Sequence, residues 1–154
     1  MTQTVTLTTK ESSLLKDLRA QEQICVEKYA RYASESRDGQ LKNLFSQIEQ
    51  TERQHVQTLD QISAGNIPQT NSAGGTQNQS QPTPNALSQQ DKNSDAYLCQ
   101  DALSTEKHVS STYNTCIFEF KDTNIRNSLN HIQKEEQQHG KQIYDYMSVN
   151  GMYC

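Results

Sequence analysis

The sequence predicts an all-α protein, a four-helix bundle made of two duplicated helical hairpins joined by a long crossover linker. Three observations favour this fold. A polar segment divides the chain into two halves, and the two halves align with each other without a gap. In each half, apolar residues recur in alternating steps of three and four, the spacing of a helix buried along one face. The length of 154 residues suits a single domain, expected over residues 1–154.

The alignment of the halves indicates an internal duplication. Residues 14–62 match residues 98–146 at a constant offset of 84 positions, with 11 identities in 49 pairs. The gapless register strengthens this interpretation, because helical bundles tolerate few insertions inside their helices. The identical pairs include Glu22 with Glu106, Glu52 with Glu136, and His55 with His139.

The first helical hairpin is expected over residues 9–64. Thr8 and Glu11 have the spacing of a capping box, which would begin the first helix. Asp38-Gly39 is a typical break between two helices, and Gly65 is a typical helix stop.

A polar segment over residues 65–92 follows and is predicted to be a flexible Asn/Gln/Ser/Pro linker. It contains all three prolines and three of the six glycines, with almost no apolar residues. The second hairpin is then expected over residues 93–150, with a break at Asp122-Thr123-Asn124. Narrow apolar stripes and this linker together explain an apolar content of only 32%.

Acidic residues interrupt the apolar stripe of every predicted helix. Both halves read E-x29-E-x-x-H, and a Glu and a His three residues apart share one face of a helix. Six side chains are therefore expected to meet at one level of the core. They are Glu22, Glu52, His55, Glu106, Glu136 and His139.

This set of residues predicts a site for two divalent metal ions. Four buried carboxylates would repel one another and take up protons, whereas two divalent cations would cancel their charge. Carboxylate and neutral imidazole suit iron or manganese, and zinc is possible. The alternative is a metal-free polar core, in which the carboxylates share protons and bond the histidines and tyrosines.

Other polar candidates have simpler interpretations. Tyr29 and Tyr113 lie two turns from a Glu at matched places, where they would either donate to the site or pack in the core. Cys25 and Cys116 are expected in the core. The sequence contains no C-x-x-C pair, so a zinc or rubredoxin-type iron site is not expected. His108 and His131 lie off the stripes and are expected at the surface. The terminal Cys154 is expected to be exposed and free to cross-link.

Composition excludes several classes of partner. The net charge is −4, and no basic cluster indicates nucleic-acid binding. No apolar run approaches the roughly 20 residues of a membrane span. The N-terminal residues contain no apolar signal core, so we expect cytoplasmic synthesis.

The duplicated E-x29-E-x-x-H pattern resembles the ferritin-like superfamily, especially rubrerythrins and bacterioferritin-type proteins. A closer resemblance is to the coat F family of bacterial spore coat proteins. The stretches ALSTEKHVSSTYNTCIFEF and LNHIQKEEQQHGKQIYDYMSVNGMY resemble the second hairpin and tail of that family. DLRAQEQICVEKYARYA and LKNLFSQIEQTERQHVQTL resemble its other half.

These resemblances imply a ferritin-like fold, a place in the coat of endospores, and association with other coat proteins or with itself. The ferritin-like pattern implies that Glu22 and Glu106 are terminal ligands and that Glu52 and Glu136 bridge the metals. His55 and His139 would each bind one metal.

Two functions are therefore expected from the sequence. One is a structural protein of the spore coat that retains the metal site. The other is a di-iron or di-manganese oxidase or peroxidase that protects against oxygen or peroxide. The catalytic residues of such an enzyme are not predicted, and the missing rubredoxin-like cysteines argue against a rubrerythrin-like electron route.

Overall fold

Four long helices begin at capped residues and account for most of the computed structural model, which describes residues 3–68 and 81–153. The helices are α1 (Thr9–Glu35), α2 (Gly39–Ser63), α3 (Gln89–Ile117) and α4 (Thr123–Val149). Two short strands, β1 (Gln3–Thr4) and β2 (Asn66–Ile67), form one antiparallel pair. The all-α, four-helix prediction is confirmed.

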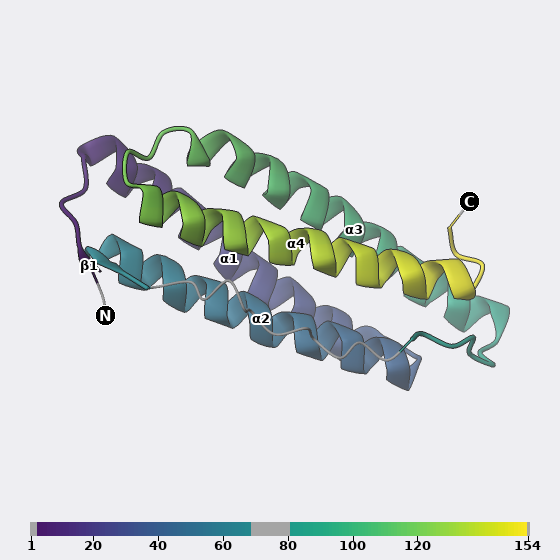
Figure 1. Ribbon diagram of the computed structural model, residues 1–154. Helices are drawn as coiled ribbons and strands as arrows, with labels where there is room; N and C mark the ends of the chain where they lie inside the picture. Colours follow the sequence, from purple (N-terminus) through teal and green to yellow (C-terminus); the bar gives the residue numbers. More distant parts are fainter. Residues whose placement is uncertain (1–2, 69–80, 154) are drawn as a thin grey trace.

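The chain order of the bundle is set by two hairpins (Figure 1). Helices α1 and α2 pack together, as do α3 and α4. Helix α2 ends where α1 begins, but α3 begins at the opposite end of the bundle, so α2 and α3 run in the same direction (Figure 1). The end of α2 and the start of α3 therefore lie at opposite ends of the bundle (Figure 1).

The linker predicted over residues 65–92 is shorter than expected at both ends. Asn66 and Ile67 form strand β2, whose backbone pairs with β1. The Ile67 side chain is buried in the core, so this part of the segment is not a linker. At the other end, Ser88 caps α3 and residues 89–92 are helical. Residues 69–80, the centre of the predicted flexible linker, lie outside the described residues.

Side chains at the helix starts explain where the helices begin. The Thr8 hydroxyl accepts from the Glu11 backbone N–H, and Glu11 accepts from the Thr8 N–H, which is the predicted capping box. Asp38 caps α2 and Asp122 caps α4, so each predicted hairpin break is also the start of a helix.

Two buried carboxylates join the hairpins to each other. Asp95 on α3 accepts from the backbone N–H groups of Arg37 and Asp38, in the turn of the first hairpin. Glu11 on α1 accepts from the N–H of Lys121, in the turn of the second hairpin. Glu11 and Asp95 are 84 positions apart, so the two contacts follow the duplication.

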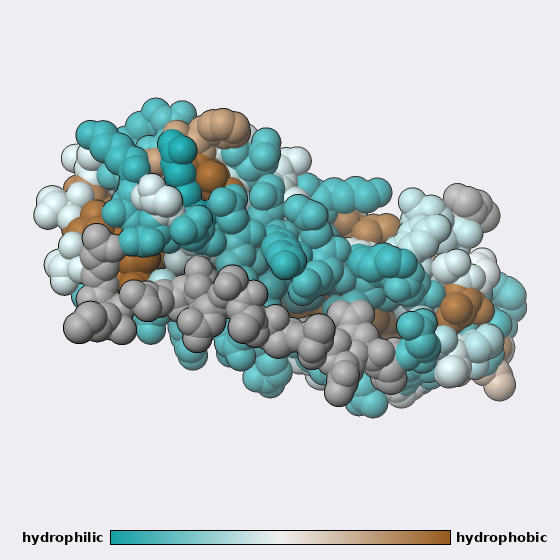
Figure 2. Space-filling model, viewed as in Figure 1, coloured by the Kyte–Doolittle hydropathy of each residue, from teal (hydrophilic) through white to brown (hydrophobic). Residues whose placement is uncertain are grey.

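The apolar core consists of two clusters, one toward each end of the bundle. Along α2, Leu41, Phe45 and Ile48 belong to one cluster, whereas Leu59 and Ile62 belong to the other. Glu52 and His55 lie between the two groups on this helix. A polar layer thus separates two apolar regions of the core. The outer face of the bundle that Figure 2 shows is mostly hydrophilic.

Candidate metal centre

The polar layer contains all six residues that the repeated motif selects. Glu22 lies on α1, Glu52 and His55 on α2, Glu106 on α3, and Glu136 and His139 on α4. All six are at most 3% exposed. The helical period places each of them on the inward face, as the sequence predicted.

These residues form two overlapping groups. One group consists of Glu22, Glu52, His55 and Glu136, and the other of Glu52, Glu106, Glu136 and His139. Within each group, one potential ligand atom from every residue lies within 4.8 Å of the others. Glu52 and Glu136 belong to both groups, as residues that bridge two ions would.

Both histidines direct Nδ1 toward the carboxylates. His55 Nδ1 lies 3.2 Å from Glu52 Oε2 and 3.0 Å from Glu136 Oε1. His139 Nδ1 lies 3.1 Å from Glu52 Oε1 and 3.7 Å from Glu136 Oε2. His55 of the first half and His139 of the second half therefore both direct Nδ1 toward the same two carboxylates, those of Glu52 and Glu136.

Several oxygen atoms of this layer accept no hydrogen bond of good geometry among the described residues, although His55 Nδ1 lies close to one of them, Glu136 Oε1. They are Glu22 Oε2, Glu106 Oε2, and both Oε1 and Oε2 of Glu136. Buried polar atoms are rarely left unpaired, because desolvation without a compensating partner costs about 1–3 kcal/mol for each group. The two histidines therefore do not supply enough hydrogen bonds for all the carboxylate oxygens that converge in this layer.

Burial and mutual repulsion change the pKa values of these carboxyl groups. Burial, together with the neighbouring Glu52, raises the pKa of Glu22 to about 8. Burial, Glu106 and Glu22 raise the pKa of Glu136 well above its usual range. In the absence of a cation, these two groups retain protons at neutral pH.

The shared carboxylate and the histidines shift in the opposite sense, toward their charged forms. Burial opposes ionisation of Glu52, but the adjacent Glu22 carboxyl and the His139 and His55 rings outweigh it and hold the pKa of Glu52 well below its usual range. Burial likewise opposes protonation of His55, but the surrounding carboxylates raise its pKa well above the usual value. The pKa of His139 is raised in the same way. These shifts favour the carboxylate form of Glu52 and the protonated forms of His55 and His139.

The donor set fits a pair of divalent cations. Four carboxylates and two imidazoles supply oxygen and nitrogen ligands of the kind that iron, manganese and zinc accept. Two such ions would match the four negative charges and would give the unpaired oxygen atoms a partner. The same combination, one Glu from each of two helices and Glu-x-x-His from the other two, occurs in di-metal carboxylate bundles.

Two buried tyrosines connect the halves of the site. The Tyr113 hydroxyl on α3 donates to Glu22 Oε1 on α1 at 2.6 Å, and the Tyr29 hydroxyl on α1 donates to Glu106 Oε1 on α3. Each tyrosine therefore holds the carboxylate of the other half. Burial and the adjacent carboxylates raise both phenol pKa values well above the usual range, so both hydroxyls remain protonated donors.

One residue near the site was missed by the sequence analysis. Glu135 Oε1 lies 3.0 Å from His55 Nε2, on the side of the ring that faces away from the carboxylate cluster. The same oxygen lies 3.2 Å from Nε2 of His131, which is partly exposed as expected but not isolated. Glu135 lies off the apolar stripe, so periodicity gave no signal. Its difference from Thr51, the equivalent residue of the first half, was the available clue.

The remaining candidates lie outside this layer. Cys25, Cys99 and Cys116 are buried free thiols, as expected for Cys25 and Cys116, and burial raises their pKa values. His108 is exposed, as expected. Cys154 lies outside the described residues.

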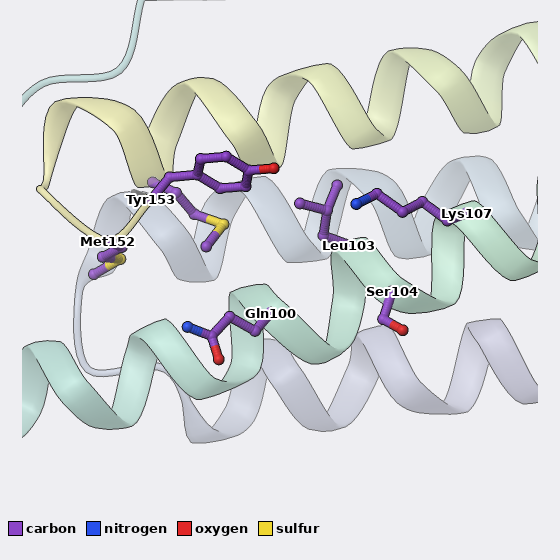
Figure 3. A pocket seen from close by; sticks show the side chains of 7 residues that line it. Gln100, Leu103, Ser104, Lys107, Met152 and Tyr153 are labelled. Carbon is purple, nitrogen blue, oxygen red and sulfur yellow. The ribbon is translucent and has the colours of Figure 1, made fainter.

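A surface pocket between α3, α4 and the C-terminal residues is chemically different from the polar layer (Figure 3). Met152 and Tyr153 line it together with Leu103 and Lys107 of α3. Lys107 is the single charged residue in its lining, so this pocket does not supply metal ligands.

Comparison with protein families identifies the second half of the chain. Residues 94–153, which include α4 and nearly all of α3, match the model of the Coat F domain. The sequence resemblance noted for the first half is not covered by this match. No curated protein and no solved structure matched the chain. In the part of the chain that the structure describes, every helix is too short or too polar to cross a membrane. By this match, residues 94–153 of this protein are similar to the Coat F domain.

Proposed function

We propose that this protein is a component of the endospore coat whose helical bundle binds two divalent metal ions, iron or manganese. The Coat F domain over residues 94–153 supports the place in the coat. The observation on which the metal site depends is the set of four buried carboxylate oxygens without a hydrogen-bond partner.

In this proposal, the chain is a ferritin-like bundle. Its support is the shared direction of α2 and α3 (Figure 1), together with a set of candidate ligands drawn from all four helices. Glu22 and His55 would bind one ion, and Glu106 and His139 would bind the other. Glu52 and Glu136 would bridge the two ions, since both residues belong to both groups.

The surrounding residues would prepare this site for metal. The hydroxyls of Tyr29 and Tyr113 restrain one oxygen each of Glu106 and Glu22, which leaves the second oxygen of each carboxylate free for an ion. The apolar clusters on either side exclude bulk water and strengthen electrostatic interactions within the layer.

A second candidate function is an oxidoreductase that removes oxygen or peroxide. Each group offers four ligating residues, fewer than the six ligands of an octahedral ion, so coordination positions would remain for a small molecule. A bound iron or manganese pair would supply the electron transfer to that molecule. The chain has no C-x-x-C pair for a rubredoxin-like centre, so electrons would come from a separate donor.

Metal analysis tests the site directly. Protein purified without chelator is expected to contain about two iron or manganese ions per chain by mass spectrometry. The double variant Glu52→Ala/Glu136→Ala should lose both ions, because both shared carboxylates are removed. The matched control, Asp60→Ala/Asp145→Ala, removes one ion-paired surface acid from each of the same two helices and should retain them.

The outcomes separate the two parts of the proposal. No bound metal, even after anaerobic loading, would mean that the carboxylates form a metal-free polar core. The coat role is tested by fractionation of spores from the producing organism, and absence of the protein from the coat fraction would refute it. Peroxide turnover by the metal-loaded protein would support the second candidate.

A further inference from the structure

The duplication allows the two halves of the metal centre to be compared residue by residue. The six ligand residues and the two tyrosines are matched across an offset of 84 positions. The partners of the two histidine Nε2 atoms, which point away from the carboxylate cluster, differ between the halves. His55 Nε2 lies 3.0 Å from Glu135 Oε1, whereas no side chain of the described residues is hydrogen-bonded to His139 Nε2.

The difference follows from a single pair of residues. The position equivalent to Glu135 in the first half is Thr51, which is too short to replace a glutamate. Its hydroxyl donates to the backbone carbonyl of Gln47 at 3.4 Å, within its own helix. His139 is therefore left without the carboxylate that His55 has.

Glu135 is also held in place from its own helix. His131 Nε2 lies 3.2 Å from Glu135 Oε1, one turn earlier on α4. The residue equivalent to His131 in the first half is Gln47. Both members of this outer pair are therefore specific to the second half, although they act on a histidine of the first half.

A carboxylate at this position changes how a histidine binds metal. When Nδ1 binds an ion, Nε2 retains its proton and can donate it to the carboxylate. This hydrogen bond fixes the tautomer and the ring orientation and makes the imidazole a stronger ligand. Loss of such a partner typically reduces metal affinity about 10–100-fold.

We infer that the two metal positions are inequivalent, and that Glu135, as a positioning residue for His55, makes the position at Glu22 and His55 the tighter one. This inference rests on the proposed function, since it concerns the same pair of ions. The position at Glu106 and His139 would fill second and would lose its ion first.

Calorimetric titration of the metal-free protein with Mn²⁺ under argon tests this inference. The wild type should bind in two steps whose affinities differ about 10–100-fold. Glu135→Thr, which gives the second half the residue of the first, should weaken the tight step until the two steps merge. Thr51→Glu should instead strengthen the weak step.

Two further variants guard against changes in folding or general charge. Glu135→Gln retains the size and an acceptor oxygen without the charge, and its tight step should fall between those of the wild type and Glu135→Thr. Glu119→Thr removes a surface acid far from the layer, paired with Lys10, and should leave both steps unchanged.

The possible outcomes distinguish this inference from the proposal on which it rests. Two equal steps that Glu135→Thr does not alter would overturn the inference alone. Absence of any Mn²⁺ binding would overturn the proposed metal site, and this inference with it.

Discussion

Glu52 and Glu136 occupy helix positions where an apolar side chain would otherwise pack against the opposite hairpin. Both are 0% exposed, between two apolar clusters. A buried charge without a partner is unfavourable by several kcal/mol, so a sequence selected for stability alone would place leucine there. The repeated acidic positions are therefore unfavourable for folding alone, which supports the proposed metal site.

The tyrosine hydroxyls give a first prediction at the scale of single residues. Tyr113→Phe should destabilise the metal-free protein by about 1–3 kcal/mol, because it leaves Glu22 Oε1 buried without its donor. The apolar ring packing is retained, so the change isolates the hydroxyl. Urea unfolding, followed by circular dichroism, measures the effect.

Tyr144→Phe is the control for this prediction, since Tyr144 is 40% exposed and its hydroxyl can bond to water. It should leave the free energy of unfolding nearly unchanged. Equal stability of Tyr113→Phe and the wild type would show that the hydroxyl contributes nothing to holding Glu22.

At the scale of helices and turns, the hairpins are joined by polar contacts as well as by the core. Glu11 projects from the first turn of α1, and Asp95 from the second turn of α3, toward the turn of the other hairpin. Residues of the polar segment add a third contact, because the side chain of Asn85 donates to the Tyr146 hydroxyl, which in turn donates to Asp38 in the turn of the first hairpin. These contacts fix the position of one hairpin along the bundle axis relative to the other.

The Asp95 contact predicts a measurable loss of stability. Asp95→Ala should reduce the free energy of unfolding by about 1.5–3 kcal/mol, because two backbone N–H groups lose a charged acceptor. Chemical denaturation measures this loss. Asp91→Ala is the matched control one turn earlier on α3. The Asp91 carboxylate is exposed and forms a long ion pair, 3.9 Å, with Arg37, so its loss should have a much smaller effect. A similar effect of both substitutions would contradict a bracing role for Asp95.

At the scale of the whole molecule, bound metal would link the four helices at their centre. Each ion would contact three or more helices, so metal should stabilise the folded bundle against unfolding. At a free Mn²⁺ concentration 100-fold above the dissociation constant, one site adds about 2.7 kcal/mol. For a chain of this size, that raises the melting temperature by about 5–10 °C, which differential scanning calorimetry would detect.

The same stabilisation should depend on pH. The Glu22 carboxyl, whose pKa is about 8, holds a proton in the metal-free state below that pH, and metal must displace it. The increase in melting temperature should therefore be larger at pH 8.5 than at pH 6. An equal increase at both pH values would show that no proton is displaced, and the Glu52→Ala/Glu136→Ala variant should show no increase at either.

The sequence by itself determined the four helices, the duplication and the six residues of the polar layer. The apolar period fixes which side of each helix is buried, and the repeat places Glu22 opposite Glu106 and His55 opposite His139. Caps such as Thr8 and Asp122 are likewise local, since each acts within its own first helical turn. Ligation of metal by the six residues stays a prediction.

Only the tertiary structure decided which side chains meet across helices. The contacts of Tyr113 with Glu22, of Glu135 with His55, and of Asp95 with the turn at Arg37 join residues 58 to 91 positions apart. These contacts depend on the rotation and axial offset of one helix relative to another, which the period of a single helix does not encode. For the same reason, the inequality of the two histidines became visible only when the packed halves could be compared.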